Sequence, residues 1–122
     1  NNPQKIDFSQ KEPFDFYIKT PECNQLILNV AKQCLATNFP ANTTDKFLLS
    51  VSLSPLDKLA HRYGPESLEV IDMIYHVDKQ IGNFMDEINQ KYGEKNVLFV
   101  LTADHGISPI PEISHTREIE RK

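Results

Sequence analysis

The apolar residues of this chain follow helical spacing in two segments. The first begins at residues 20–22, where Thr20 offers an N-cap, proline occupies the first helical position and an acid follows in the first turn. It ends before Pro40. The spacing predicts one buried stripe on this helix, formed by Leu26, Ile27, Val30, Ala31, Cys34 and Leu35.

A longer helix is predicted between Gly64-Pro65 and Gly93, and Gly93 is suited to its C-terminal end. Met73 and Met85 are expected to fill the core. The predicted apolar stripe consists of Leu68, Ile71, Ile74, Tyr75, Ile81, Phe84, Met85, Ile88 and Tyr92.

Two short, continuous apolar runs flank the long helix, at residues 46–53 (KFLLSVSL) and 96–101 (NVLFVL). Such runs are typical of strands that are covered on both faces of a parallel sheet. A strand, a helix and a second strand in this order form a right-handed βαβ unit with parallel strands. We therefore expect an α/β fold with parallel strands and flanking helices.

The 122 residues suffice for one domain. We expect an N-terminal extended segment at 1–19, in which Phe14, Phe16 and Tyr17 suggest a short extended piece, then an α/β domain fragment at 20–112 and a tail at 113–122.

Charge and cysteine content exclude several classes of function. A net charge of -4 without a basic stripe argues against binding to a nucleic acid polymer, and the run 97–101 is too short to span a bilayer. Cys23 and Cys34 lie on one predicted helix, about 16 Å apart, beyond the roughly 7 Å limit for a disulfide. We expect Cys34 to be buried and Cys23 to lie near the helix start.

Polar side chains follow each predicted strand. Asp57 and His61, at i and i+4, come after the first strand, and Asp104-His105 comes after the second. Parallel strands deliver such residues to one sheet edge, where open α/β folds bind ligands. Gly106 is expected to let the backbone turn so that Asp104 and His105 need not point in opposite directions. Carboxylate and imidazole suit zinc. Taken alone, Asp57 and His61 are equally well explained by a local hydrogen bond near a helix start, and Asp104-His105 by a loop cap. Their coincidence at one edge favours a metal site.

Other polar residues have ordinary explanations. His76, with Asp72 and Asp78, lies on the long helix, where a solvated face or pairing with Lys79 is usual. His115 could complete a metal shell, but a surface imidazole in a polar tail is the simpler explanation. Four hydroxyl residues lack the context of a nucleophile, namely Thr43, Thr44, Ser52 and Ser54.

Residues 52–78 (SLSPLDKLAHRYGPESLEVIDMIYHVD) and 98–106 (LFVLTADHG) resemble the type I phosphodiesterase/nucleotide pyrophosphatase branch of the alkaline phosphatase superfamily. The similarity is strongest to phosphate-irrepressible-type bacterial alkaline phosphatases and covers about 20–112. The D-x-x-x-H, G-P and T-A-D-H-G elements carry it. It implies that the chain is part of a larger alkaline-phosphatase-like α/β sandwich.

The resemblance also implies two zinc ions that bind the phosphoryl group of a phosphate ester. Asp57 and His61 would hold one ion, and Asp104 and His105 the other. The family's remaining ligands are an early aspartate, an early hydroxyl nucleophile and a late histidine, and none has a matching position here. We therefore expect about half of a two-metal site and no turnover by this chain alone.

This sequence departs from the family at two positions, with Ala60 where glycine is common and His76 where arginine is common. Bacterial members are mostly exported, which implies a periplasmic or secreted location. Two alternatives remain: a manganese-dependent mutase of the same superfamily, related to phosphopentomutase or phosphoglycerate mutase, and a non-enzymatic α/β interaction module.

Overall fold

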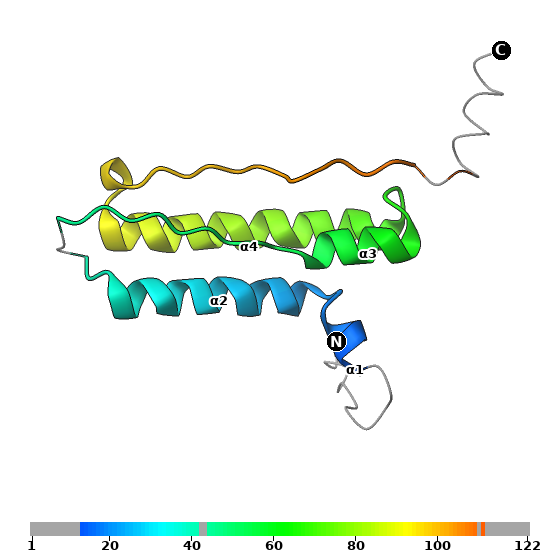
Figure 1. Cartoon of the computed structure of the whole chain (residues 1–122), viewed down its shortest axis with the longest axis horizontal. Coiled ribbons are helices and arrows are strands. Elements are labelled where there is room, and N and C mark those ends of the chain that lie inside the picture. Colours follow the sequence, from blue (N-terminus) through cyan, green and yellow to red (C-terminus); the bar gives the residue numbers. More distant parts are fainter. Residues whose placement is uncertain (1–12, 42–43, 110, 112–122) are drawn as a thin grey trace, which may run out of the picture.

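The computed structural model describes residues 13–41, 44–109 and 111, and the regular elements assigned there are all helical. None of these helices is both long and apolar enough to cross a membrane. In Figure 1, α2 and α4 lie side by side and run in the same direction, and α3 packs near the start of α4. The elements are α1 (Pro13–Tyr17), α2 (Pro21–Asn38), α3 (Pro55–Tyr63), α4 (Leu68–Tyr92) and the 3-10 turn η1 (Glu94–Asn96).

The predicted helix ends are confirmed where the sequence carries a specific end signal. Helix α2 begins at Pro21, directly after Thr20. Helix α4 begins at Leu68 and not at Gly64-Pro65, because the Ser67 hydroxyl caps it by accepting a hydrogen bond from the Val70 amide. It ends as predicted at Gly93, which has a φ of 85°. A left-handed φ is open to glycine without a Cβ penalty, so the residue type itself determined this boundary.

The buried face of α2 differs from the predicted stripe. The predicted stripe residues Leu26 and Val30 are 50% and 61% exposed, and Cys34 is exposed instead of buried. Both cysteines are free, as expected. The apolar residues of α2 lie on more than one face of the helix, so the contact with α4 decides which face is buried. The buried residues are Asn24, Leu28, Ala31 and Leu35.

The predicted stripe on α4 is right in its second half and wrong in its first. Ile88 is buried, and Ile81, Phe84, Met85 and Tyr92 are half-buried. In the first half, Leu68 and Tyr75 are 80% and 73% exposed. The face that packs there carries Val70 and Met73, and Met73 is only 1% exposed, which confirms it as a core residue.

The centre of the core lies between α3 and α4. Leu59 and Ala60 from α3 pack against Val70 and Met73 from α4, with Leu56 and Val77 at the margin. Farther along α4, the Glu87 carboxylate pairs with Lys32 of α2 at 2.9 Å, and the Tyr92 hydroxyl donates to the Phe39 carbonyl at 2.8 Å. These contacts hold the C-terminal part of α2 alongside the C-terminal part of α4.

The predicted parallel-strand βαβ unit is wrong, because no strand is assigned within the described residues. The segments 44–53 and 97–109 are extended and return past α4 in the same direction as one another (Figure 1). Backbone N–H and C=O groups form a strand only when a neighbouring chain segment pairs with them in a ladder. An apolar run therefore shows that a segment tends to be extended, and only a suitable neighbour makes it a strand.

Burial alternates along the first of these segments. Leu49, Val51 and Leu53 are half-buried, whereas Leu48 is 95% exposed. Phe47 anchors the segment by stacking on Phe39 at a centroid distance of 4.0 Å. The sequence predicted cover on both faces, but the described helices cover one face only.

The N-terminal part also differs from its prediction. Phe14, Phe16 and Tyr17 lie in the short helix α1 and not in an extended piece. Lys19 contributes to this turn because its ammonium group donates to the Asp15 carbonyl at 2.8 Å and pairs with the Asp15 carboxylate. Residues 1–12 and the predicted tail at 113–122 lie outside the described residues, so the proposed domain limits there stay predictions.

Replacing Met73 by alanine should lower the free energy of unfolding by about 2 to 4 kcal/mol, because it removes apolar volume from the centre of the core. Leu68→Ala, on the same helix but exposed, should change it by less than about 0.5 kcal/mol. Urea denaturation of both variants measures the difference. Equal effects would contradict the assignment of the α3–α4 contact as the core.

Candidate metal centre

Helix α3 presents Asp57 and His61 together on its outer surface. Pro55 begins the helix and the Gly64 amide closes it by donating to the Ala60 carbonyl at 2.8 Å. Because Leu59 and Ala60 are buried against α4, the residues one turn apart at 57 and 61 lie toward solvent. The distance between Asp57 Oδ1 and His61 Nε2 is 3.3 Å.

Asp104 and His105 lie at the end of the second extended segment and are tied together locally. The Asp104 carboxylate accepts a hydrogen bond from the His105 amide at 3.1 Å, and its other oxygen lies 3.6 Å from His105 Nε2. Gly106 has no left-handed φ and an added Cβ would meet nothing within 4 Å. The prediction that Gly106 was needed for the turn is therefore wrong. The Asp104 side chain brings the pair together.

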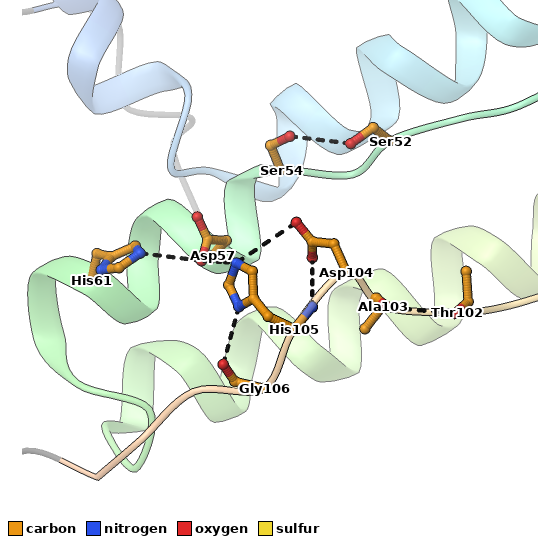
Figure 2. A network of polar contacts seen from close by, with 9 residues as sticks. All are labelled: Ser52, Ser54, Asp57, His61, Thr102, Ala103, Asp104, His105 and Gly106. Carbon is orange, nitrogen blue, oxygen red and sulfur yellow. Dashed lines mark hydrogen bonds and ion pairs between the residues drawn. The ribbon is translucent and has the colours of Figure 1, made fainter.

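The two pairs meet at Asp57. Figure 2 shows His105 reaching across from the extended segment toward Asp57 on α3, and the distance between His105 Nε2 and Asp57 Oδ1 is 3.9 Å. Asp57 Oδ1 is buried and has no hydrogen-bond partner, because neither imidazole completes a hydrogen bond to it. All four residues singled out in the sequence are thus brought to one place, around one unsatisfied carboxylate oxygen.

Polar neighbours on several sides change the pKa of His105. Its pKa is raised above 6.5, chiefly because its Nδ1 donates to the Gly106 carbonyl at 3.0 Å, and further because of the carboxylates of Asp104 and then Asp57. With the Nδ1 proton committed to Gly106, the lone pair of neutral His105 lies on Nε2, the atom nearest both carboxylates. A backbone acceptor on the second ring nitrogen is the usual way that a metal-ligating histidine is oriented.

Carboxylate and imidazole groups are donors that zinc accepts in proteins, although the described residues do not form a closed ligand set. Two donors across a tetrahedral zinc ion, each bonded at about 2.0 to 2.1 Å, are about 3.3 Å apart. The distances from His61 to Asp57 and from His105 to Asp104, at 3.3 and 3.6 Å, are close to that value. No cluster of three or more acidic, histidine or cysteine ligands is preformed among the described residues.

The other candidate residues stay outside the cluster. His76 lies exposed on α4, as predicted, but its Nε2 is 3.7 Å from the Asp72 carboxylate, so the local partner that the structure shows is Asp72 and not Lys79. His115 lies outside the described residues. Ala60, the position at which the sequence departs from the expected glycine, is buried in the core between α3 and α4.

Two residues that sequence reasoning set aside border the cluster. Ser52 and Ser54 stand just before α3, and their hydroxyl oxygens are 3.3 Å apart (Figure 2). The signal that could have found Ser54 is the spacing Ser54-x-x-Asp57, which matches a capping box.

Comparison with known proteins gives the same family that the sequence motifs indicate. The sequence pattern of the family described as type I phosphodiesterase/nucleotide pyrophosphatase matches residues 2–122. Alkaline phosphatase PhoV of Synechococcus elongatus is 34% identical over 75% of this chain and 16% of its own length. Alkaline phosphatase PafA of Elizabethkingia meningoseptica is 33% identical over 71% of this chain and 16% of its own length. Ectonucleotide pyrophosphatase/phosphodiesterase family member 7 of Mus musculus is 32% identical over 54% of this chain and 15% of its own length.

The chain belongs to the type I phosphodiesterase/nucleotide pyrophosphatase family, a family of phosphoric ester hydrolases. It spans about a sixth of the length of the curated relatives described above. No solved structure matches it.

Asp104→Asn should lower the pKa of His105 without returning it to its ordinary value, because the bond to the Gly106 carbonyl is the larger cause of the increase. An NMR titration of the ring carbon protons measures the change. In the matched control Asp72→Asn, which removes the carboxylate beside His76, the His105 titration should not move. An unchanged curve in Asp104→Asn would contradict the proposed contact.

The sign of the linked stability follows from the same pKa. Because the folded pKa of His105 is raised, its stabilising contribution is complete below the unfolded value, about 6.5, and is lost as the pH rises through the folded value.

Proposed function

We propose that this chain is one part of a zinc-dependent phosphoric ester hydrolase and that it contributes about half of a two-metal site. Asp57, His61, Asp104 and His105 are the proposed ligands. The observation that carries the proposal is their convergence around Asp57 Oδ1, from a helix and an extended segment more than 40 residues apart in the chain. Family membership supports the hydrolase assignment independently.

The division of ligands follows the resemblance to the family. Asp57 and His61 form one pair on α3, and Asp104 and His105 form a second pair on the extended segment. The 3.9 Å contact between His105 and Asp57 supports two neighbouring metal positions because it links the pairs directly. In this arrangement a bound zinc pair would polarise a phosphoryl oxygen and lower the pKa of a hydroxyl nucleophile.

The residues of the chain itself orient the donors and balance charge. The Gly106 carbonyl holds the Nδ1 proton of His105 and thereby keeps Nε2 free for a ligand bond. The Asp104 carboxylate, bonded to the His105 amide, keeps the carboxylate and imidazole of the second pair together. The carboxylates of Asp57 and Asp104 offset part of the charge that two divalent ions bring to the site.

The substrate class is a phosphate ester, and the named relatives include both phosphatases and a phosphodiesterase. A hydroxyl nucleophile and the remaining ligands are expected from other parts of a longer protein, and an exported location is expected from the resemblance to bacterial members. Metal analysis of the intact protein distinguishes a zinc hydrolase from the manganese-dependent mutase alternative.

Adding zinc to the chain should raise its melting temperature with metal concentration, because an ion that binds only the folded state stabilises it by about 2.7 kcal/mol at one hundred times its dissociation constant. Asp57→Asn combined with Asp104→Asn should abolish the increase. The control variant Asp72→Asn should keep it, since the His76 pair lies on the exposed face of α4. An equal zinc response in all three proteins would show that binding occurs elsewhere, as would be expected of an interaction module with an incidental polar edge.

The 122-residue chain loaded with zinc should not hydrolyse a nitrophenyl phosphate ester faster than its Asp57→Ala/Asp104→Ala variant, because the chain has no hydroxyl in the context of a nucleophile. A colorimetric assay of both proteins at matched zinc concentration measures the rates. Zinc-dependent turnover well above the double variant would overturn the proposal that the site is completed by other parts of the protein.

A further inference from the structure

The turn that leads into α3 has an unusual serine. Ser54 occupies the N-cap position, but its hydroxyl makes no capping hydrogen bond, and it pairs with the Ser52 hydroxyl at 3.3 Å. An N-cap serine ordinarily accepts a hydrogen bond from an amide two or three residues ahead. Asp57 stands three residues after Ser54, so the sequence Ser54-x-x-Asp57 matches a capping box. The structure does not form the capping hydrogen bond of the Ser54 hydroxyl.

Ser67 provides the ordinary case in the same molecule. It precedes α4 with an extended backbone, φ −71° and ψ 155°, and its hydroxyl accepts from the Val70 amide at 3.3 Å. Ser54 has φ −76° and ψ −14°, a helical backbone conformation. The same residue type at the same helix position thus behaves differently because the preceding backbone differs.

The absence of a capping interaction at Ser54 accompanies an unusual position of the Asp57 side chain. In a capping box the acidic side chain at the third position reaches back to the amide of the N-cap residue. The Asp57 carboxylate is turned to the imidazoles instead, with Oδ1 3.3 Å from His61 Nε2 and 3.9 Å from His105 Nε2. Figure 2 shows the serine pair on one side of Asp57 and the two histidines on the other.

We propose that the hydroxyl pair of Ser52 and Ser54 is a positioning device for the metal centre. By pairing with each other, the two hydroxyls hold Ser54 in its helical conformation and prevent the capping box from closing. The Asp57 carboxylate then stays directed at His61 and His105. The inference deepens the proposed function, because the positioned carboxylate is one of the proposed zinc ligands, and both serines act through Asp57.

Ser52→Ala is the decisive variant, because it leaves α3 intact and frees the Ser54 hydroxyl to cap the helix. The capping box should then close, so the Asp57 amide should exchange more slowly with solvent and the ring resonances of His61 and His105 should shift. Zinc affinity should fall about 10-fold, the lower end of the effect of losing an outer-shell partner. Ser52→Thr, which keeps a hydroxyl, should restore both the resonances and the affinity.

Ser67→Ala is the matched control, because it removes a cap that is in use on a different helix, α4. It should lower the melting temperature by about 4 °C and leave the histidine resonances and zinc affinity unchanged. The metal-free resonances separate this inference from the proposed function. If Ser52→Ala shifts the metal-free histidine resonances while the wild-type chain binds no zinc, the positioning role is supported and the proposed zinc site is contradicted. If they do not move in Ser52→Ala, the positioning role is overturned, whatever the zinc affinity.

Discussion

The packing of α3 on α4 is the contact on which the candidate site depends. A helix of nine residues has little stability of its own, because so few hydrogen bonds cannot offset the loss of chain entropy on nucleation. Burial of Leu59 and Ala60 against Val70 and Met73 supplies what α3 lacks. The same contact decides which side of α3 faces outward, and Asp57 and His61 stand on that side. The site is therefore a consequence of the core as much as of its own polar residues.

The candidate site leaves one buried polar atom, the Oδ1 oxygen of Asp57, without a hydrogen-bond partner. An unsatisfied buried acceptor carries a free-energy penalty of about 1 to 3 kcal/mol. The pKa of the neighbouring His105 is raised chiefly by its hydrogen bond to the Gly106 carbonyl, and further by the carboxylates of Asp104 and then Asp57. A divalent cation held by the proposed ligands would give Asp57 Oδ1 the partner that it lacks. Such unsatisfied groups are expected at functional sites, where local stability is sacrificed for binding.

The resemblance to a phosphoric ester hydrolase family was visible in short stretches of sequence and is confirmed across nearly the whole chain. The fold prediction drawn from apolar runs was wrong, because the residues at 46–53 and 96–101 show only that the backbone tends to be extended. The exposed Leu48, Leu98 and Val100 illustrate the reason. Their apolar character predicted cover on a second face, yet cover is a property of neighbouring elements and not of the run itself.

By itself the sequence determined the properties that depend on residues close together in the chain. These include the start of α2 at Pro21, the end of α4 at Gly93 and the pairing of Asp57 with His61 one helical turn apart. The tertiary structure alone decided which face of α2 is buried, that no strand ladder forms in the described residues, and that His105 reaches Asp57. Local propensities arise from steric and hydrogen-bonding limits within a few residues. Burial and contact between distant residues depend on how whole elements pack, which no short window of sequence contains.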